Sequence, residues 1–321
     1  MDRWLVGMAL AVGLAFPAGC ARSEAASDSD RLTIGAYSVV REALHEGLLP
    51  AFADEWRGRT GRSVRFEESY NASGAQARAI AAGLDADVAI LSMDSDLDIL
   101  AKAGLPLERR GVVSRSLVVI GVRPGNPRAI ADWADLAQPG VSVVYPDPKT
   151  SGGARWNINA IYGSGLRASG KEAARELLAS IQRNVVAMDS SGRQSLATFE
   201  RGTGDAIVTY ENELRLATKM THAEHPYVVP PQTLLIESPA ALVAPSLHRH
   251  GNREVAEAFL DFLAGPRGQA ILAEYGFRAL DAPLPEGVFA MKDLGGWKAM
   301  KAEVYDAGGV WDSLFSPGGR R

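Results

Sequence analysis

Cysteine, net charge and long apolar runs are all scarce in this chain of 321 residues. Cys20 is the only cysteine, so no disulfide can form within the chain. The 34 basic side chains nearly balance the 38 acidic ones, which leaves no overall basic field to attract nucleic acid or anionic lipid. A membrane-spanning helix needs about 20 apolar residues, and no segment of the chain provides them. We therefore expect a globular protein in which any bound anion is held by local geometry.

The N-terminal segment has the pattern of an export signal. Residues 4–16 are apolar and small residues follow, so we expect residues 1–20 to be a secretory signal peptide. The sequence PAGC at 17–20 resembles the bacterial lipoprotein box, with proline in place of the usual leucine, and predicts lipid on Cys20. An ordinary signal peptide that happens to contain a cysteine is the alternative. The small, polar residues 21–30 are typical of a flexible tether, and the location predicted is the periplasm or cell surface.

From Arg31 onward, short β-branched runs alternate with amphipathic stretches, which predicts an α/β fold with mostly parallel strands. Helices are expected at 171–183 and 253–263. Two α/β domains would form a cleft, and ligands of such sheets collect at the carboxyl ends of strands. The hydrophobic content of 46% can fill two cores. The expected lobes are 31–117 with 211–321 (lobe I) and 118–210 (lobe II), with hinge crossings near 118–122 and 209–211.

Three loops share a Ser-Gly composition and lead from a strand into a helix: 70–74, 149–154 and 189–193. The first turn of a helix has unpaired N–H groups and a partial positive charge, so each loop is a candidate anion site. Glycine lets the backbone approach a ligand, and a hydroxyl adds a donor. The plainer interpretation of each loop is a helix cap and a turn. The residue chemistry alone predicts an anion without specifying which one.

The segment YPDPKTSGGARWN (Tyr145–Asn157) resembles the signature of bacterial periplasmic sulfate-binding proteins, which supply ATP-driven importers. Further segments match in order, from AYSVVRE through ESYNASGAQARAI and MDSSGRQSLATF to GGWKAMKAEVYDAGGVWD, so that the resemblance covers nearly all of residues 32–315. The resemblance implies an α/β fold of the two-lobed type II periplasmic binding protein kind, with sulfate as ligand. It also implies that the protein is a monomer and that its partners are the permease and ATPase of an ABC transporter. Binding of thiosulfate, molybdate, tungstate or phosphate is an alternative, and so is an enzyme or signalling receptor on the same scaffold.

The resemblance also implies which residues bind the ligand, because the family holds sulfate with neutral donors. Two positions depart from the enterobacterial pattern, since Ser38 replaces an aspartate and Tyr210 replaces a tryptophan whose indole N–H reaches the ligand. Carried over by position, the expected ligand-binding residues are Ser38, Ser73, Ser151, Gly152, Gly153, Gly192 and Tyr210.

No catalytic or metal-binding pattern accompanies these loops. The five histidines show no recognisable metal spacing with carboxylates, and no nucleophile is paired with a base. Glu211 and Glu213 are interpreted as capping or salt-bridge residues rather than catalytic carboxylates. We therefore expect a binding protein with no cofactor, no metal and no enzymatic activity.

Overall fold

The computed structural model describes residues 29–315. The predicted signal peptide, the predicted lipidation site at Cys20 and most of the predicted tether lie outside these residues and stay predictions. Strand β1 (Ser29–Tyr37) begins two residues inside the expected tether. Ser29 and Asp30 pair in parallel with Ser63 and Val64, and Asp30 Oδ2 also accepts the indole N–H of Trp56 at 2.7 Å.

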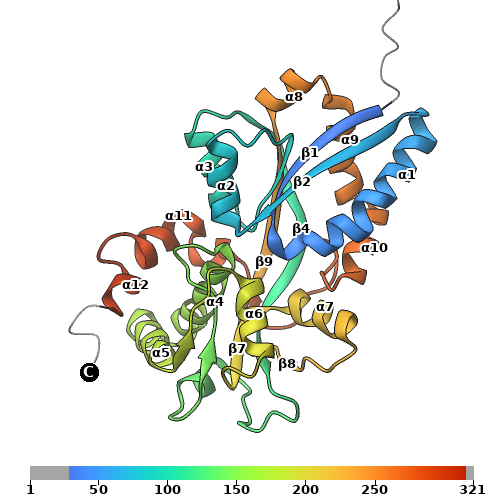
Figure 1. The fold of residues 1–321 in the computed structure, drawn as a ribbon. Coiled ribbons are helices and arrows are strands. Elements are labelled where there is room, and N and C mark those ends of the chain that lie inside the picture. The colour runs from blue at the N-terminus through green and yellow to red at the C-terminus, as the bar shows by residue number, and fades with distance from the viewer. Residues whose placement is uncertain (1–28, 316–321) are drawn as a thin grey trace, which may run out of the picture.

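The first part of the chain forms a parallel three-stranded unit in which β1 lies between β2 and β3. The helices of this unit appear beside these strands in Figure 1. Every residue of β3 is buried, as its continuous apolar run predicts. The elements are β2 (Ser63–Asn71), β3 (Val88–Ile90), α1 (Leu49–Thr60), α2 (Ser73–Ala81), α3 (Asp94–Lys102) and the short helices η1 (Ser38–Val40) and η2 (Ala43–Leu48).

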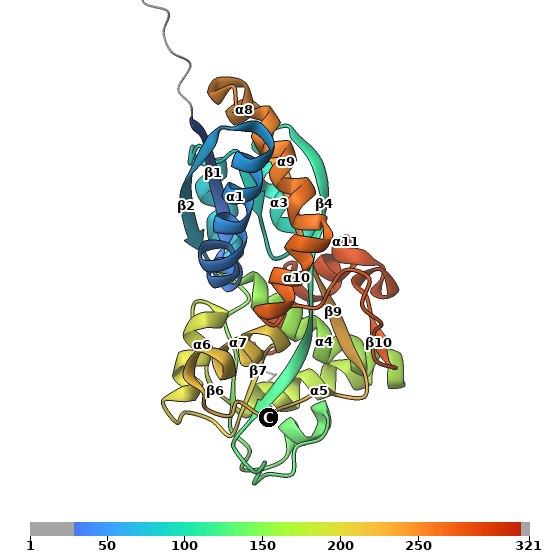
Figure 2. The same ribbon diagram turned by 90° about the vertical axis from the view of Figure 1, so that its right-hand side faces the viewer.

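Two long antiparallel strands, β4 (Leu107–Val122) and β9 (Thr233–Val243), link this unit to the rest of the molecule. β4 pairs with β9 along its first part and with β7 (Ala206–Tyr210) at 118–122. Figure 2 shows β4 running from one end of the molecule to the other. The second strand that passes between the two units is therefore β9. At 209–211, where a second crossing is expected, β7 ends and α7 (Glu211–Thr221) begins, and this helix packs against β4 and β7.

The second unit has β5 parallel to both β6 and β7. Its strands are short, and β7 is buried at every position. The helix expected at 171–183 is confirmed with those bounds. The elements are β5 (Val143–Val144), β6 (Val185–Ala187), β8 (Tyr227–Val228), η3 (Trp133–Ala137), α4 (Gly152–Ser169), α5 (Lys171–Arg183), α6 (Gly192–Glu200) and α7 (Glu211–Thr221).

The C-terminal part returns to the first unit and then lies against α4. Trp297 meets Trp156 edge to face at 4.7 Å between ring centroids, and the Tyr305 hydroxyl donates to Asn159 Oδ1 at 3.0 Å, so aromatic side chains hold this segment in place. The elements are α8 (Ala244–His250), α9 (Arg253–Ala264), α10 (Pro266–Glu274), β10 (Val288–Phe289), η4 (Met291–Leu294), α11 (Gly296–Met300), η5 (Lys301–Tyr305) and α12 (Val310–Ser313).

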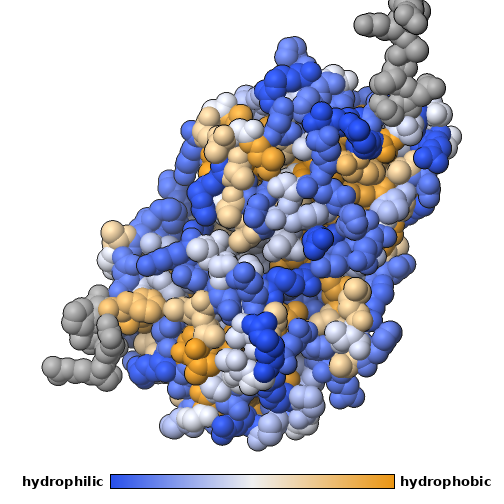
Figure 3. All heavy atoms as spheres, viewed as in Figure 1, coloured by the Kyte–Doolittle hydropathy of each residue, from blue (hydrophilic) through white to orange (hydrophobic). Residues whose placement is uncertain are grey.

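The surface in Figure 3 is mostly hydrophilic, with apolar residues in scattered places. Within residues 29–315, no helix combines the length and the apolar character needed to cross a membrane. Apolar side chains are buried in the core of the first unit. There the Phe52 ring packs against the rings of Trp56 and Phe259, at centroid distances of 6.0 and 5.1 Å.

Candidate functional site

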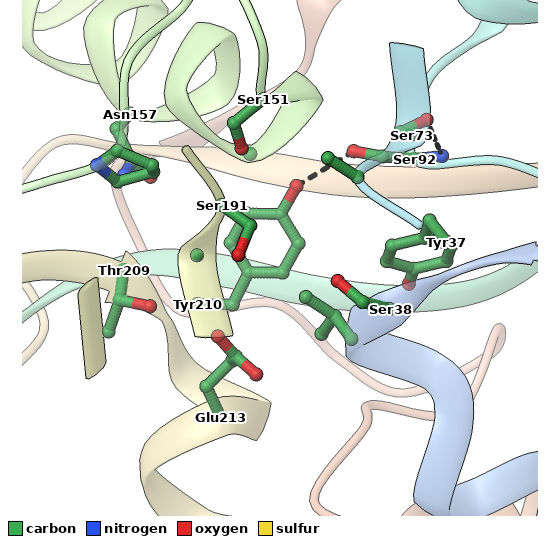
Figure 4. Close-up of a pocket in the computed structure, with 15 residues that line it drawn as sticks. Tyr37, Ser38, Ser73, Ser92, Ser151, Asn157, Ser191, Thr209, Tyr210 and Glu213 are labelled. Atoms are coloured by element: carbon green, nitrogen blue, oxygen red, sulfur yellow. Dashed lines mark hydrogen bonds between the residues drawn. The ribbon is translucent and has the colours of Figure 1, made fainter. Parts of the chain in front are cut away.

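A small cavity of about 20 Å³ lies between the two units, at the carboxyl ends of their parallel strands. Figure 4 shows side chains from both units pointing toward it. The first turn of a helix has N–H groups without intrahelical acceptors and carries a partial positive charge, so the cavity collects hydrogen-bond donors without a basic side chain. Its wall contains residues that begin five helical segments, namely Ser38 of η1, Ser73 of α2, Ser151 and Gly153 of α4, Gly192 of α6 and Tyr210 before α7.

All of the residues expected to bind ligand line this cavity except Gly152. A Cβ on Gly152 would lie 3.0 Å from Ser73 Cβ and 3.1 Å from Asp96 Oδ2. Gly152 therefore lets α4 approach the opposite unit closely, whereas a Cβ on Gly153 would lie beside Ser151 Oγ and the Tyr210 hydroxyl inside the cavity. The ligand-binding role of each residue stays a prediction.

The serines at the starts of α4 and α6 cap their helices. Ser151 Oγ accepts from the Ala154 N–H at 3.4 Å, and Ser191 Oγ accepts from the Gln194 N–H at 3.3 Å. The cap interpretation of these loops is therefore correct, and it is compatible with binding. A hydroxyl that accepts in this way still has its own proton to donate to a ligand.

Ser73 differs from these caps because its hydroxyl is fully used within the protein. Its Oγ donates to Asp96 Oδ2 at 2.6 Å and accepts from the Ser92 N–H at 2.8 Å. Burial raises the pKa of Asp96, which favours the protonated acid, while the Ser73 hydrogen bond opposes this shift. Because the hydroxyl proton of Ser73 is used by Asp96, only the main chain of Ser73 could donate a hydrogen bond to a ligand.

Sequence reasoning missed several residues of the cavity wall, including Ser92, Asn157, Thr209 and Glu213. Ser92 could have been found, because it lies just beyond the carboxyl end of the apolar run that forms β3. Asn157 donates from Nδ2 to the Val208 carbonyl at 2.8 Å, and its Oδ1 has no partner among residues 29–315. That amide oxygen is an acceptor in a wall made mostly of donors.

Glu213 is the acidic residue of the cavity wall, and its side chain is 1% exposed. Burial raises its pKa, the Arg193 guanidinium at 3.3 Å lowers it, and Glu42 and Glu200 raise it further. Glu211, in contrast, fits its interpretation as a salt-bridge residue. Its carboxylate lies 2.6 Å from the Arg278 guanidinium, and Glu211 is not part of the cavity wall.

Contacts across the cavity join the two units. Ser92 Oγ lies 2.8 Å from the Tyr210 hydroxyl, and the Trp156 indole N–H donates to the Ser92 carbonyl at 2.9 Å. Arg193 donates to Glu42 at 2.8 Å. A small anion in the cavity would therefore be surrounded by donors from both units.

The arrangement provides hydrogen bonds rather than reactive groups. Among the described residues, no group of three or more His, Cys, Asp or Glu side chains is placed to hold a metal ion. Two α/β units with a small, donor-lined cavity at their strand ends define the class of periplasmic binding proteins.

Comparisons with known proteins agree with this class. The profile of the bacterial extracellular solute-binding protein family matches residues 32–278. The chain therefore belongs to that family. A sulfate-binding protein of Synechococcus elongatus is 38% identical over 305 residues, covering 88% of this chain and 86% of that protein. A thiosulfate-binding protein of Pseudomonas aeruginosa is 32% identical and covers 94% and 96%.

A solved structure supports the same assignment. The sulfate-binding protein SubI of Mycobacterium tuberculosis superposes with a TM-score of 0.78 at 33% identity and covers 86% of this chain and all of that one. The periplasmic thiamin binding protein shares the fold alone, at 15% identity and a TM-score of 0.64. The resemblance to periplasmic sulfate-binding proteins and the predicted fold class are thus confirmed.

Proposed function

We propose that the protein captures sulfate outside the cytoplasmic membrane and delivers it to the permease and ATPase of an ABC importer. The observation that carries this proposal is the ring of helix N-termini around one small cavity. Relatives named as sulfate-binding proteins, which match nearly the whole chain, support the choice of ligand. Among the expected ligand groups are the hydroxyl of Ser151 and the main-chain N–H groups of Gly153 and Gly192.

Neutral donors are sufficient for this task. A hydrogen bond to a charged group contributes about 1.5–3 kcal/mol, and micromolar affinity corresponds to about 8 kcal/mol. Several converging donors therefore reach the required affinity without a countercharge. The N-terminal ends of α4 and α6 add a favourable field for an anion.

Thiosulfate is the nearest alternative ligand, because a thiosulfate-binding protein is among the relatives. Molybdate, tungstate and phosphate remain alternatives within the same class of anions. We propose that the protein is not an enzyme, since the cavity provides no nucleophile held by a base. An enzyme or a signalling receptor on this scaffold is the competing class of function.

We also propose that the chain works as two lobes that close on the ion about β4 and β9, the strands that link the two units. The contacts of Tyr210 with Ser92 and of Arg193 with Glu42 would then form on closure. The protein would act as a monomer, held at a membrane surface by lipid on Cys20.

Calorimetric titration of the purified, anion-stripped protein tests the function. The panel contains sulfate, thiosulfate, molybdate, tungstate and phosphate. We expect sulfate to bind one to one with a Kd of roughly micromolar or lower. No heat and no thermal shift with millimolar sulfate would overturn the proposal, and tighter binding of another member of the panel would reassign the ligand.

A further inference from the structure

Ser92 is a buried hydroxyl of the cavity that neither the sequence pattern nor the family resemblance singled out. It follows β3 in the first unit, whereas Tyr210 ends β7 in the second. The two hydroxyl oxygens lie 2.8 Å apart, and Figure 4 marks the bond between them. Both side chains are almost fully buried, at 1% and 3% exposure, so water does not compete for this contact.

A third group determines how the protons are arranged. The Trp156 indole N–H donates to the Ser92 carbonyl at 2.9 Å and to Ser92 Oγ at 3.1 Å. An indole N–H can only donate, so Ser92 Oγ is already an acceptor on this side. A hydroxyl that accepts a hydrogen bond becomes a better donor. Ser92 is thus biased to donate its own proton to the Tyr210 oxygen.

The Tyr210 hydroxyl then has its proton available for the cavity. A Cβ on Gly153 would lie 3.6 Å from the Tyr210 oxygen, which places the phenol beside the N-terminus of α4. Burial raises the pKa of Tyr210, so the phenol keeps its proton at neutral pH.

We propose that Ser92 is a specificity-determining residue, which orients the Tyr210 hydroxyl as a hydrogen-bond donor to the bound anion through the chain Trp156 to Ser92 to Tyr210. This inference rests on the proposed function and deepens it. A fully ionised oxyanion such as sulfate accepts the Tyr210 proton. Ser92 acts through Tyr210, so its effect requires the phenol oxygen to be present.

A protonated oxyanion such as hydrogen phosphate meets an unfavourable arrangement at this point. To accept the proton of the ligand, Tyr210 would have to donate to Ser92 instead. Ser92 Oγ would then accept from Trp156 and Tyr210 together, and its own proton would lose the acceptor that it has in the structure. A buried donor without a partner is costly, so Ser92 favours ions without protons.

The test is a double-mutant cycle with Ser92→Ala and Tyr210→Phe, titrated calorimetrically with sulfate and with inorganic phosphate at pH 7. Each single variant should weaken sulfate binding roughly tenfold. Ser92→Ala should also reduce the ratio of sulfate to phosphate affinity. In the Tyr210→Phe background, Ser92→Ala should change sulfate affinity by less than about twofold, because the group that it orients is gone.

Ser246→Ala removes a buried serine hydroxyl on α8, outside the cavity wall, and serves as the matched control. Failure of the native protein to bind any oxyanion would overturn the proposed function and this inference together. Sulfate binding by the native protein with strictly additive losses in the cycle, or an unchanged affinity ratio in Ser92→Ala, would overturn the inference alone. Tyr210→Phe removes a single oxygen, so it tests the same chain if Ser92→Ala does not fold.

Discussion

The Arg193 guanidinium lies 2.8 Å from the Glu42 carboxylate, although 151 residues separate them in the sequence. Glu42 belongs to the first unit and Arg193 to α6 of the second, so this ion pair joins the two units. Behind it, Glu213 lies 3.3 Å from the same guanidinium. Arg193 therefore joins one carboxylate across the cleft to another in the cavity wall.

Replacing this arginine should affect both closure and stability. Arg193→Met leaves the buried Glu213 without its cation and removes the contact with Glu42. We expect a loss of about 2 kcal/mol in the free energy of unfolding, less than the 3–5 kcal/mol typical of fully buried pairs because the guanidinium is partly exposed. Sulfate should dissociate roughly tenfold faster, measured by stopped-flow fluorescence.

Arg183→Met is the control for this change, because Arg183 pairs with Glu176 at 3.3 Å and both side chains are exposed. Such a pair should contribute less than about 1 kcal/mol. Equal effects of the two substitutions on dissociation would show that the Arg193 contacts do not hold the cleft closed.

Glu213 should make the stability of the protein depend on pH. Its folded-state pKa is raised, so the folded protein binds this proton more tightly than the unfolded chain. The free energy of unfolding should therefore decrease as pH rises from the ordinary glutamate pKa, about 4.3, through the raised pKa of Glu213. The total decrease should be about 1.4 kcal/mol for each pH unit between these two pKa values. Glu213→Gln should flatten this decrease in urea unfolding between pH 4 and 8, whereas Glu224→Gln, at an exposed position, should not. The same slope in both variants would exclude Glu213 as the source.

The two neighbouring glycines at the start of α4 should respond differently to a side chain. Gly153→Val would place methyl groups beside Ser151 Oγ and the Tyr210 hydroxyl, so the heat of sulfate binding should disappear while the thermal unfolding temperature changes little. Gly152→Val would press against Ser73 and Asp96 and should weaken binding by opposing closure.

Gly58→Val is the control, since a Cβ at that position in α1 would meet nothing within 4 Å. It should bind sulfate like the native protein. Normal sulfate binding by Gly153→Val would show that the ligand site lies elsewhere.

Lipid on Cys20 should decide where the protein is found. Cys20→Ala, expressed in a bacterium with lipoprotein processing, should move the protein from the membrane fraction to the soluble fraction or leave the precursor uncleaved. Ser27→Ala in the tether is the matched control. If both variants fractionate like the native protein, the cysteine is incidental.

The helix at 171–183 and the buried strand β7 could be predicted from the sequence, because their periodicity and apolar runs are local signals. The three Ser-Gly loops contribute residues to one cavity wall, as expected from the convergence of the carboxyl ends of parallel strands. The antiparallel pairing of β4 with β9 could not be predicted, because it joins residues more than one hundred positions apart.

The finer structure of the site depended on the same distant contacts. From the sequence, Glu213 is interpreted as a capping or salt-bridge residue, and only its packing beside Gly192 and Arg193 places it in the cavity wall. Gly152 and Gly153 are adjacent in sequence but have different neighbours, which the spacing of a helix start does not reveal. Ser92 carried a positional signal at a strand end, whereas its bond to Tyr210 required the two units to be placed together.

The central claim is that neutral donors at the helix starts hold sulfate in this cavity. A crystal structure of the protein with selenate, an analogue of sulfate, tests it through anomalous scattering at the selenium edge. We expect one peak in the cavity, with selenate oxygens about 3 Å from the Gly153 and Gly192 nitrogens and from Ser151 Oγ. A peak that appears only outside this cavity, or an ion held there by the Arg193 side chain in place of these groups, would contradict the account.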